Sequence, residues 1–262
     1  KKLELFNESY AKKTGFYYQH VAANGGFFKD DSVRNTYLTF SVGEIDYIII
    51  NLDFGATDDI LEWAGSVLEA HPEHRAILTT HGYLNGDGTT LDVTDAYDPT
   101  TYDKKFNSGE EMWEKLVSKY ENIEMVICGH EMSENIVINH RKGDKGNTVT
   151  EMLINPQGID VYSPVGKGII AILYFNEDGT KCELEYYSTV LDKYYKTNNQ
   201  LAIDLTEEGE TEPAGWNGSF EEPLGSGTKR DPYLISSGGH LMWMAEMCDT
   251  AKTLSPTESD PN

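Results

Sequence analysis

Two histidines stand at positions where apolar stretches of the sequence end. His81 follows residues 76–80, and His130 follows residues 123–128 after a single glycine. Short apolar runs of this kind predict buried strands, and the loops that follow strands often carry functional side chains. Imidazoles at such places bind metals or transfer protons. A lone histidine beside a strand is more often structural, but two of them with glycine neighbours favour one shared site.

The elements that position these histidines can be predicted from the surrounding pattern. Apolar residues recur at helical spacing after an N-cap at Thr57, and Ser108 with Glu111 has the pattern of a capping box before a second helix. A long polar loop at 82–107 separates the strand before His81 from that second helix. With strands at 37–42, 45–52, 76–80 and 123–128, the order predicts an α/β layer with right-handed crossovers.

The rest of the chain has a different character. Residues 1–35 show no sustained period and predict an ordered loop with a short helix around 7–13. Alternating stretches at 134–140, 148–154, 168–175 and 181–188 predict hairpins in a second, antiparallel sheet. Residues 204–222 are acidic and turn-forming, which predicts a linker between a first domain at 1–203 and a small incomplete α+β block at 223–262 with a disordered tail.

Composition limits the classes of function. Acidic residues number 44 against 21 lysines and arginines, a formal net charge of -23, so we expect no nucleic acid as a main partner. The three cysteines have neither zinc-site nor disulfide spacing. No apolar run reaches the roughly 18 residues of a transmembrane segment. The sequence begins with Lys1 and shows no signal peptide, so we expect a fragment whose N-terminus lies upstream.

The sequence around the two histidines resembles a known family. The runs T-H-G-Y-L at 80–84 and C-G-H at 128–130, with the helix at 61–72, are similar to the C-terminal half of the calcineurin-like metallophosphoesterases. The resemblance covers about residues 1–195. It implies a two-sheet α/β sandwich that holds two divalent metal ions (manganese, iron or zinc) and hydrolyses a phosphate ester with an activated water. It matches His81 and His130 to two ligands of the same metal.

The chain also departs from the family. Met132 replaces the second histidine of the family's G-H-x-H motif, and a thioether is a poor ligand for a hard divalent ion. The motifs D-x-H, G-D-x-x-D and G-N-H-[DE] are absent, so the resemblance implies that a missing N-terminal half of the same polypeptide supplies the other ligands. We therefore expect this chain alone to be inert and to hold metal poorly, with an exposed apolar edge around 48–52 that promotes association.

Three further residues are candidates for the same cleft. Met132 is expected to face it, because this position holds the last ligand in the family. Asp53 ends a predicted strand and could support a metal ligand, although aspartates at such positions are more often turn formers. Gln157, in the turn N-P-Q-G, could face the cleft or belong to a simple turn. No catalytic residue beyond these ligand candidates can be named from the sequence.

Two functions are open on the sequence. The first is metal-dependent phosphoester hydrolysis by a secreted, multidomain bacterial protein. The alternative is a degraded phosphoesterase scaffold that acts as a cell-surface binding or adhesion module. Residues 227–236 resemble the start of repeat modules in secreted bacterial surface proteins, so we expect an extracellular or cell-surface setting. The three missing motifs, if found upstream, would favour the enzyme.

Overall fold

The computed structural model describes residues 13, 15–29, 32–133, 135–157, 167–195, 199–206, 228, 233 and 240–247. The chain divides into two compact units, Lys1–Glu210 and Thr211–Asn262. In the second unit, residues 240–247 form a helix, and the rings of Tyr233 and Trp243 lie 4.9 Å apart. No helix within the described ranges has the length and apolar character that crossing a membrane requires.

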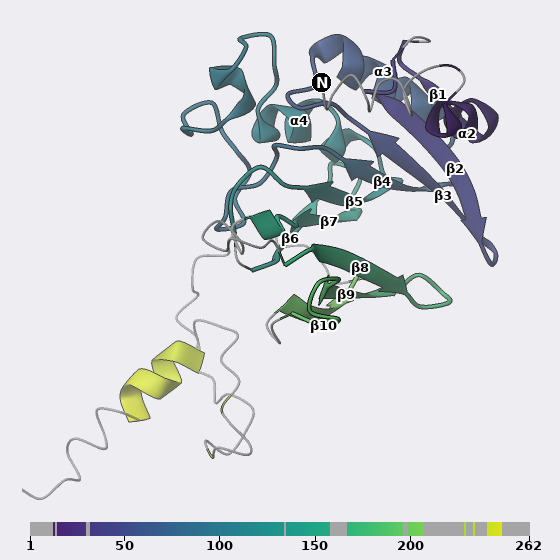
Figure 1. Ribbon diagram of the computed structural model, residues 1–262. Helices are drawn as coiled ribbons and strands as arrows, with labels where there is room; N and C mark the ends of the chain where they lie inside the picture. The colour runs from purple at the N-terminus through teal and green to yellow at the C-terminus, as the bar shows by residue number, and fades with distance from the viewer. Residues whose placement is uncertain are drawn as a thin grey trace, which may run out of the picture. The chain divides into compact units, whose positions relative to one another are not determined.

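A seven-stranded mixed sheet forms the centre of the first unit (Figure 1). Its order is β1-β2-β3-β4-β5-β7-β6. The neighbours β3, β4, β5 and β7 pair in parallel, and the remaining pairs are antiparallel. The carboxyl ends of the parallel strands therefore meet at one edge of the sheet. The strands are β1 (Gly25–Phe27), β2 (Thr36–Val42), β3 (Ile45–Asn51), β4 (Arg75–Thr79), β5 (Ile123–Cys128), β6 (Val137–Lys142) and β7 (Thr148–Leu153).

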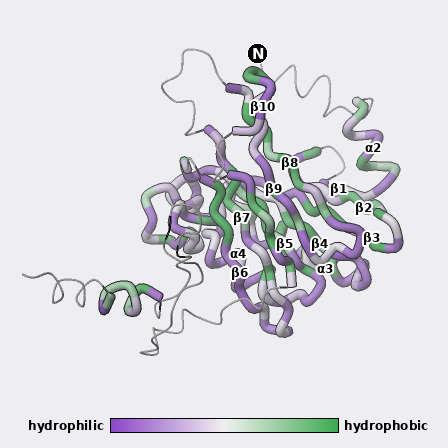
Figure 2. Tube along the Cα trace, turned by 90° about the horizontal axis from the view of Figure 1, so that it is seen from below, coloured by the Kyte–Doolittle hydropathy of each residue, from purple (hydrophilic) through white to green (hydrophobic). Residues whose placement is uncertain are grey.

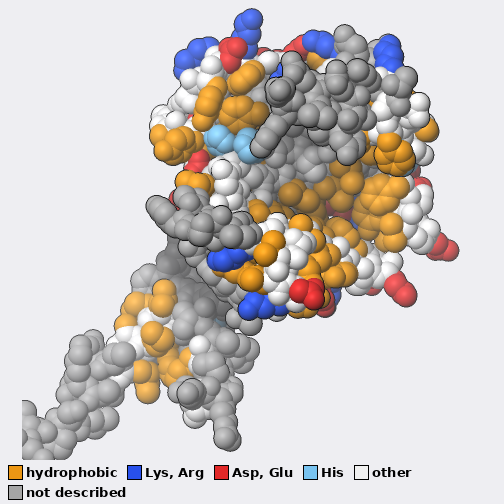
Figure 3. All heavy atoms as spheres, in the orientation of Figure 1, with side chains coloured by type: hydrophobic (Ala, Val, Ile, Leu, Met, Phe, Trp, Pro, Cys, Tyr) orange, Lys and Arg blue, Asp and Glu red, His pale blue; other side chains and the backbone are white. Residues whose placement is uncertain are grey.

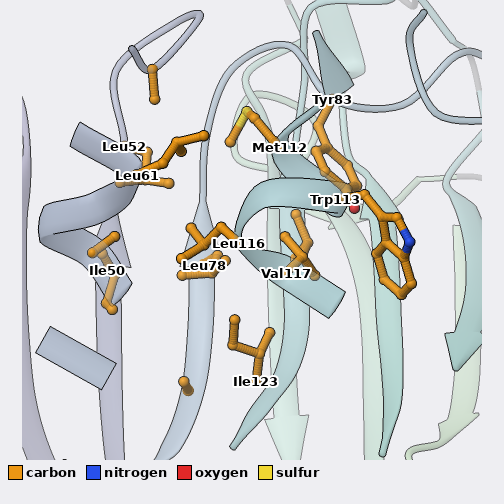
Figure 4. Packing of buried hydrophobic residues seen from close by; sticks show 14 of the residues in the cluster. Ile50, Leu52, Leu61, Leu78, Tyr83, Met112, Trp113, Leu116, Val117 and Ile123 are labelled. Atoms are coloured by element: carbon orange, nitrogen blue, oxygen red, sulfur yellow. The ribbon is translucent and has the colours of Figure 1, made fainter. Parts of the chain in front are cut away.

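Two helices cover one face of this sheet. α3 (Asp58–Ala70) connects β3 to β4, and α4 (Gly109–Lys115) with the short η3 (Val117–Lys119) leads into β5. Both reciprocal bonds of the predicted capping box between Ser108 and Glu111 are present. Buried side chains from the strands and the helices form one core, in which Ile50 and Leu78 face Leu61 and Leu116 (Figure 4). This core holds β4 and β5 in place, and with them the loops that follow.

A second, antiparallel sheet covers the other face. It contains β8 (Ile169–Phe175), β9 (Lys181–Ser188), β10 (Lys193–Tyr194) and β11 (Gln200–Asp204), with β9 between β8 and the other two. Leu184 and Tyr186 of β9 pack in one cluster with Ile77 and Met125 of the main sheet. The central parallel strands are thus covered on both faces, which explains their largely apolar sequences (Figure 2).

The α/β class with a second antiparallel sheet is confirmed, but three details were wrong. The first predicted hairpin belongs to the main sheet, because β7 pairs in parallel with β5. The sequence was predicted to be a loop at residues 16–24, but these residues form the helix α2 (Phe16–Asn24). This helix buries only Val21, so no apolar period marked it in the sequence. The helix expected around residues 7–13 is not tested, because residues 7–12 lie outside the described residues. The apolar edge expected at 48–52 is interior, since β3 lies between β2 and β4 and both Ile48 and Ile50 are fully buried.

Candidate functional site

His81 and His130 lie next to each other at the carboxyl edge of the main sheet. β4 and β5 are parallel neighbours, and the Gly129 amide donates a hydrogen bond of 2.9 Å to the His81 carbonyl oxygen. The ring centroids of the two histidines are 5.0 Å apart, with an interplanar angle of 70°. The structure therefore brings together the two residues that the sequence singled out, and we refer to them as the histidine pair.

The backbone around His130 fixes which ring nitrogen carries the hydrogen. Nε2 of His130 lies 2.9 Å from the carbonyl oxygen of Tyr97. Because a carbonyl oxygen can only accept, Nε2 donates, and Nδ1 of the neutral ring keeps its lone pair. A histidine that binds a metal typically donates its second nitrogen to a backbone carbonyl or a carboxylate in this way. In this arrangement Nδ1 of His130 is the ring nitrogen that could bind a metal ion.

His81 lies in an environment that favours the neutral imidazole. Partial burial lowers the pKa of His81, and the nearby charge of His130 lowers it further. Phe54, from the loop after β3, contributes to this environment, since its ring centroid lies 5.6 Å from that of His81 and 5.0 Å from that of His130. Gly82 makes room for Phe54, because a Cβ atom at residue 82 would come within 2.9 Å of the ring. The close packing of the Phe54 ring therefore explains why residue 82 is a glycine.

The long loop at 82–107 forms an aromatic border on one side of the histidine pair. Tyr97 and Tyr102 are each 60% exposed, and the Tyr102 ring meets Phe54 edge-on at 5.2 Å. The loop is nevertheless anchored: the buried Asp98 accepts a hydrogen bond from the Thr100 amide at the start of η2 (Pro99–Thr101). Histidine side chains reach the surface beside hydrophobic ones in the space-filling view (Figure 3). The border can therefore contact a bound molecule.

The other three candidates, Asp53, Met132 and Gln157, differ in their exposure and their partners. Asp53 forms an ion pair with Arg34, and its carboxylate also accepts a 3.1 Å hydrogen bond from the Phe54 amide, as a turn former would. Met132 is 63% exposed, and its orientation toward the cleft stays a prediction. Gln157 is exposed, while its neighbour Asn155 is buried and donates to the Glu131 carbonyl oxygen at 2.9 Å. The N-P-Q-G turn is therefore tied to the loop that carries His130.

The histidine pair offers two of the donors that a metal site would need. Two imidazoles this close can share one ion, with metal–nitrogen distances of about 2.0–2.1 Å for zinc. Yet among the described residues no group of three or more histidine, cysteine, aspartate or glutamate side chains gathers as a metal site would require. A hydrolytic zinc normally has three protein ligands. The histidine pair would supply two of these three ligands, and the described residues alone do not complete the set.

A buried polar cluster near the site was not visible in the sequence. Glu151 of β7 points into the helix-side core and is fully buried. Its carboxylate accepts hydrogen bonds from the Tyr83 hydroxyl at 2.5 Å and from Asn139 at 2.9 Å. Burial raises the pKa of Glu151 to about 7, although these two bonds and the charge of Arg141 act in the opposite direction. Since Tyr83 follows His81 by two residues, the cluster anchors the loop of the histidine pair.

Comparisons with known proteins show only distant similarity. No protein-family model matches the chain. The uncharacterized protein YvnB of Bacillus subtilis (strain 168) is 29% identical over an alignment of 195 residues, which covers 69% of this chain and 14% of that protein. The chain therefore spans only a small part of the relative's length.

One solved structure is similar at a lower level. It is a Staphylococcus aureus protein provisionally assigned as a 5'-nucleotidase, determined in complex with α-ketoglutarate. It is 14% identical with a TM-score of 0.32, and the match covers 68% of this chain and 31% of that one. A likeness at this level is too weak to assign a fold or a function.

Proposed function

We propose that this protein is a metal-dependent phosphoester hydrolase in which the histidine pair supplies two ligands of one metal ion. The remaining ligands come from outside the described residues. A divalent ion in such a site supplies positive charge for a phosphoryl group and acidity for a bound water. The substrate class rests on the resemblance of residues 80–84 and 128–130 to the metallophosphoesterases.

The arrangement of the histidine pair carries the proposal. Both rings lie at the carboxyl edge of parallel strands, 5.0 Å apart, and the hydrogen bond to Tyr97 fixes the His130 ring with Nδ1 available. The lowered pKa of His81 favours the neutral form, which is the form that binds metal. A purely structural histidine would need neither an exposed ring nor a second imidazole beside it.

Metal binding tests the site directly. We expect this chain to bind zinc or manganese weakly in calorimetric titrations, because two imidazoles offer half a tetrahedral site and no negative charge. His81→Ala and His130→Ala should each weaken that binding at least about tenfold. His20→Ala, at an exposed position of α2, is the matched control and should leave it unchanged. Equal affinity in all four proteins would remove the histidine pair from consideration as a metal site.

Turnover tests the chemistry. We expect the chain alone to leave a chromogenic phosphate ester intact with added manganese or zinc, and the full-length polypeptide that contains it to hydrolyse the ester. His81→Ala should abolish hydrolysis in the full-length protein, while His20→Ala should retain it. A full-length protein that binds metal through the histidine pair but shows no turnover on monoesters or diesters would instead favour the binding or adhesion module.

We also propose an extracellular or cell-surface setting. The support is the sequence of residues 227–236, which resembles the start of repeat modules in secreted bacterial surface proteins; of these, the structure describes only residues 228 and 233. Antibody detection on intact cells and in culture supernatant should find the protein there. Detection confined to the cytosolic fraction would contradict the proposal.

A further inference from the structure

β8 is an edge strand without the usual protection of an edge. Its seven residues, I-I-A-I-L-Y-F, contain no charge and no proline, and its pairing with β9 runs without a bulge from Ile169 to Phe175. Within the described residues β9 is its only strand neighbour. Stable proteins protect edges with charges, prolines, bulges or very short strands, because an unprotected edge pairs with other chains.

The other sheet shows what ordinary protection looks like in this molecule. At one edge, β6 has the sequence V-I-N-H-R-K with three basic or imidazole side chains, and at the other edge β1 is only three residues long. β8 differs from both. A strand that is apolar on both faces has the sequence of a strand inside a sheet.

The side chains of β8 that face the main sheet are less buried than those of β9. Side chains of β9 that face the main sheet, such as Leu184 and Tyr186, are fully buried. Those of β8 that face the same way, Ile169, Ala171 and Leu173, are only partly buried. The core between the two sheets therefore buries these side chains of β9 completely and those of β8 only in part.

The outer face of β8 and the space beside it are apolar as well. Ile170 and Tyr174 are 45% and 47% exposed, whereas the neighbouring positions on the outer face of β9 include Glu183 and Glu185. A cavity of about 300 Å³ lies between the end of β8 and the β2–β3 hairpin, lined by residues such as Phe40. Hydrophobic side chains are visible along this hollow (Figure 3).

We propose that β8 is an internal strand of the complete protein, and that an apolar strand from the part of the polypeptide outside residues 1–262 pairs with its open edge. Among the described residues the outer backbone groups of β8 have no strand partner, so the occupant of this edge should be an extended chain. The half-buried side chains favour an occupant that is apolar on the face toward the main sheet. The length of the relative supports a source in the same polypeptide, since the match covers only 14% of YvnB. The inference is independent of phosphoester chemistry.

Hydrogen exchange followed by mass spectrometry or NMR tests this pairing. In an antiparallel edge strand every second amide points away from its neighbour, so about half of the β8 amides should exchange rapidly in the 262-residue chain. In the full-length polypeptide the same amides should exchange at least about a hundredfold more slowly. The amides of β6 provide the matched control and should exchange alike in both proteins.

Sedimentation at several concentrations completes the test. Rapid exchange of the β8 amides in both proteins would overturn the proposal. Slow exchange in the 262-residue chain together with concentration-dependent association would show that a second copy occupies the edge. Slow exchange in a monomeric 262-residue chain would place the occupant within this chain. Both of the latter results would also overturn the assignment to an outside segment.

Discussion

Replacing Glu151 with glutamine should change how stability depends on pH. Glu151 is fully buried, and burial raises its pKa from 4.5 to about 7. Because the folded-state pKa lies above the unfolded value, the folded protein binds more protons between these two values. The stability that the protonated Glu151 side chain contributes is therefore fully present below about pH 4.5. This contribution is lost as the pH rises through about 7. At about 1.4 kcal/mol for each unit, the loss amounts to roughly 3 kcal/mol.

Glu151→Gln removes this titration while keeping the shape of the side chain. The amide oxygen of the glutamine can still accept a hydrogen bond from the Tyr83 hydroxyl. Its amide nitrogen can donate to the Asn139 side-chain oxygen once the Asn139 amide group has rotated by about half a turn. We expect the variant to gain stability relative to the parent as pH rises, by roughly 3 kcal/mol at pH 8.

Urea unfolding between pH 5 and pH 8 measures the difference in free energy of unfolding between variant and parent. Taking the difference cancels the carboxylates that titrate alike in both proteins. Glu183→Gln, on the exposed face of β9, is the matched control for the loss of one surface carboxylate. A flat difference for Glu151→Gln would refute the reasoning, since it would mean that Glu151 is ionised at no cost in the folded protein.

Three smaller changes test the surroundings of the site. Ser108→Ala removes the capping box of α4 and should lower the free energy of unfolding by about 1 kcal/mol in urea titrations. Tyr83→Phe removes a buried donor to Glu151, so it should cost about 1–3 kcal/mol and move the pH-dependent loss to higher pH. Gly82→Ala should shift the ring resonances of the histidine pair in NMR spectra and cost about 1–3 kcal/mol. Gly86→Ala, where a Cβ atom meets nothing within 4 Å, should do neither.

Local patterns predicted the frame of this fold well. Continuous apolar runs marked β3, β4 and β5, and the capping box marked the start of α4, because each signal is contained in a few adjacent residues. The juxtaposition of the histidine pair followed from strand order alone. The hairpin of β6 and β7 was misplaced because alternation does not reveal which sheet a hairpin joins.

The surroundings of the site could not be predicted in the same way. The Tyr97 contact with His130 uses a backbone carbonyl, which leaves no mark in the sequence. Phe54 reaches the histidine pair through the fold, across 27 residues of chain to His81. Glu151 lies in the alternating stretch T-V-T-E-M-L, where a glutamate suggests a solvent-facing position. It is buried because Tyr83 and Asn139 supply hydrogen bonds that make burial tolerable.

The backbone of His130 connects stability with the proposed chemistry. His130 has a φ of 71°, in the left-handed region that residues other than glycine seldom adopt, although asparagine, aspartate and histidine do so more often than the rest. Such a conformation costs of order 1–3 kcal/mol and persists only where neighbours hold it. Here the Tyr97 carbonyl holds the ring, the hydrogen bond from Gly129 to His81 holds the preceding residue, and Asn155 holds Glu131 on the other side. Glycine would adopt this backbone at lower cost, and the position is occupied by a histidine, beside a second imidazole whose pKa is lowered. Departures from local preference of this kind are expected at functional sites, so the backbone of His130 supports the ligand site that we propose.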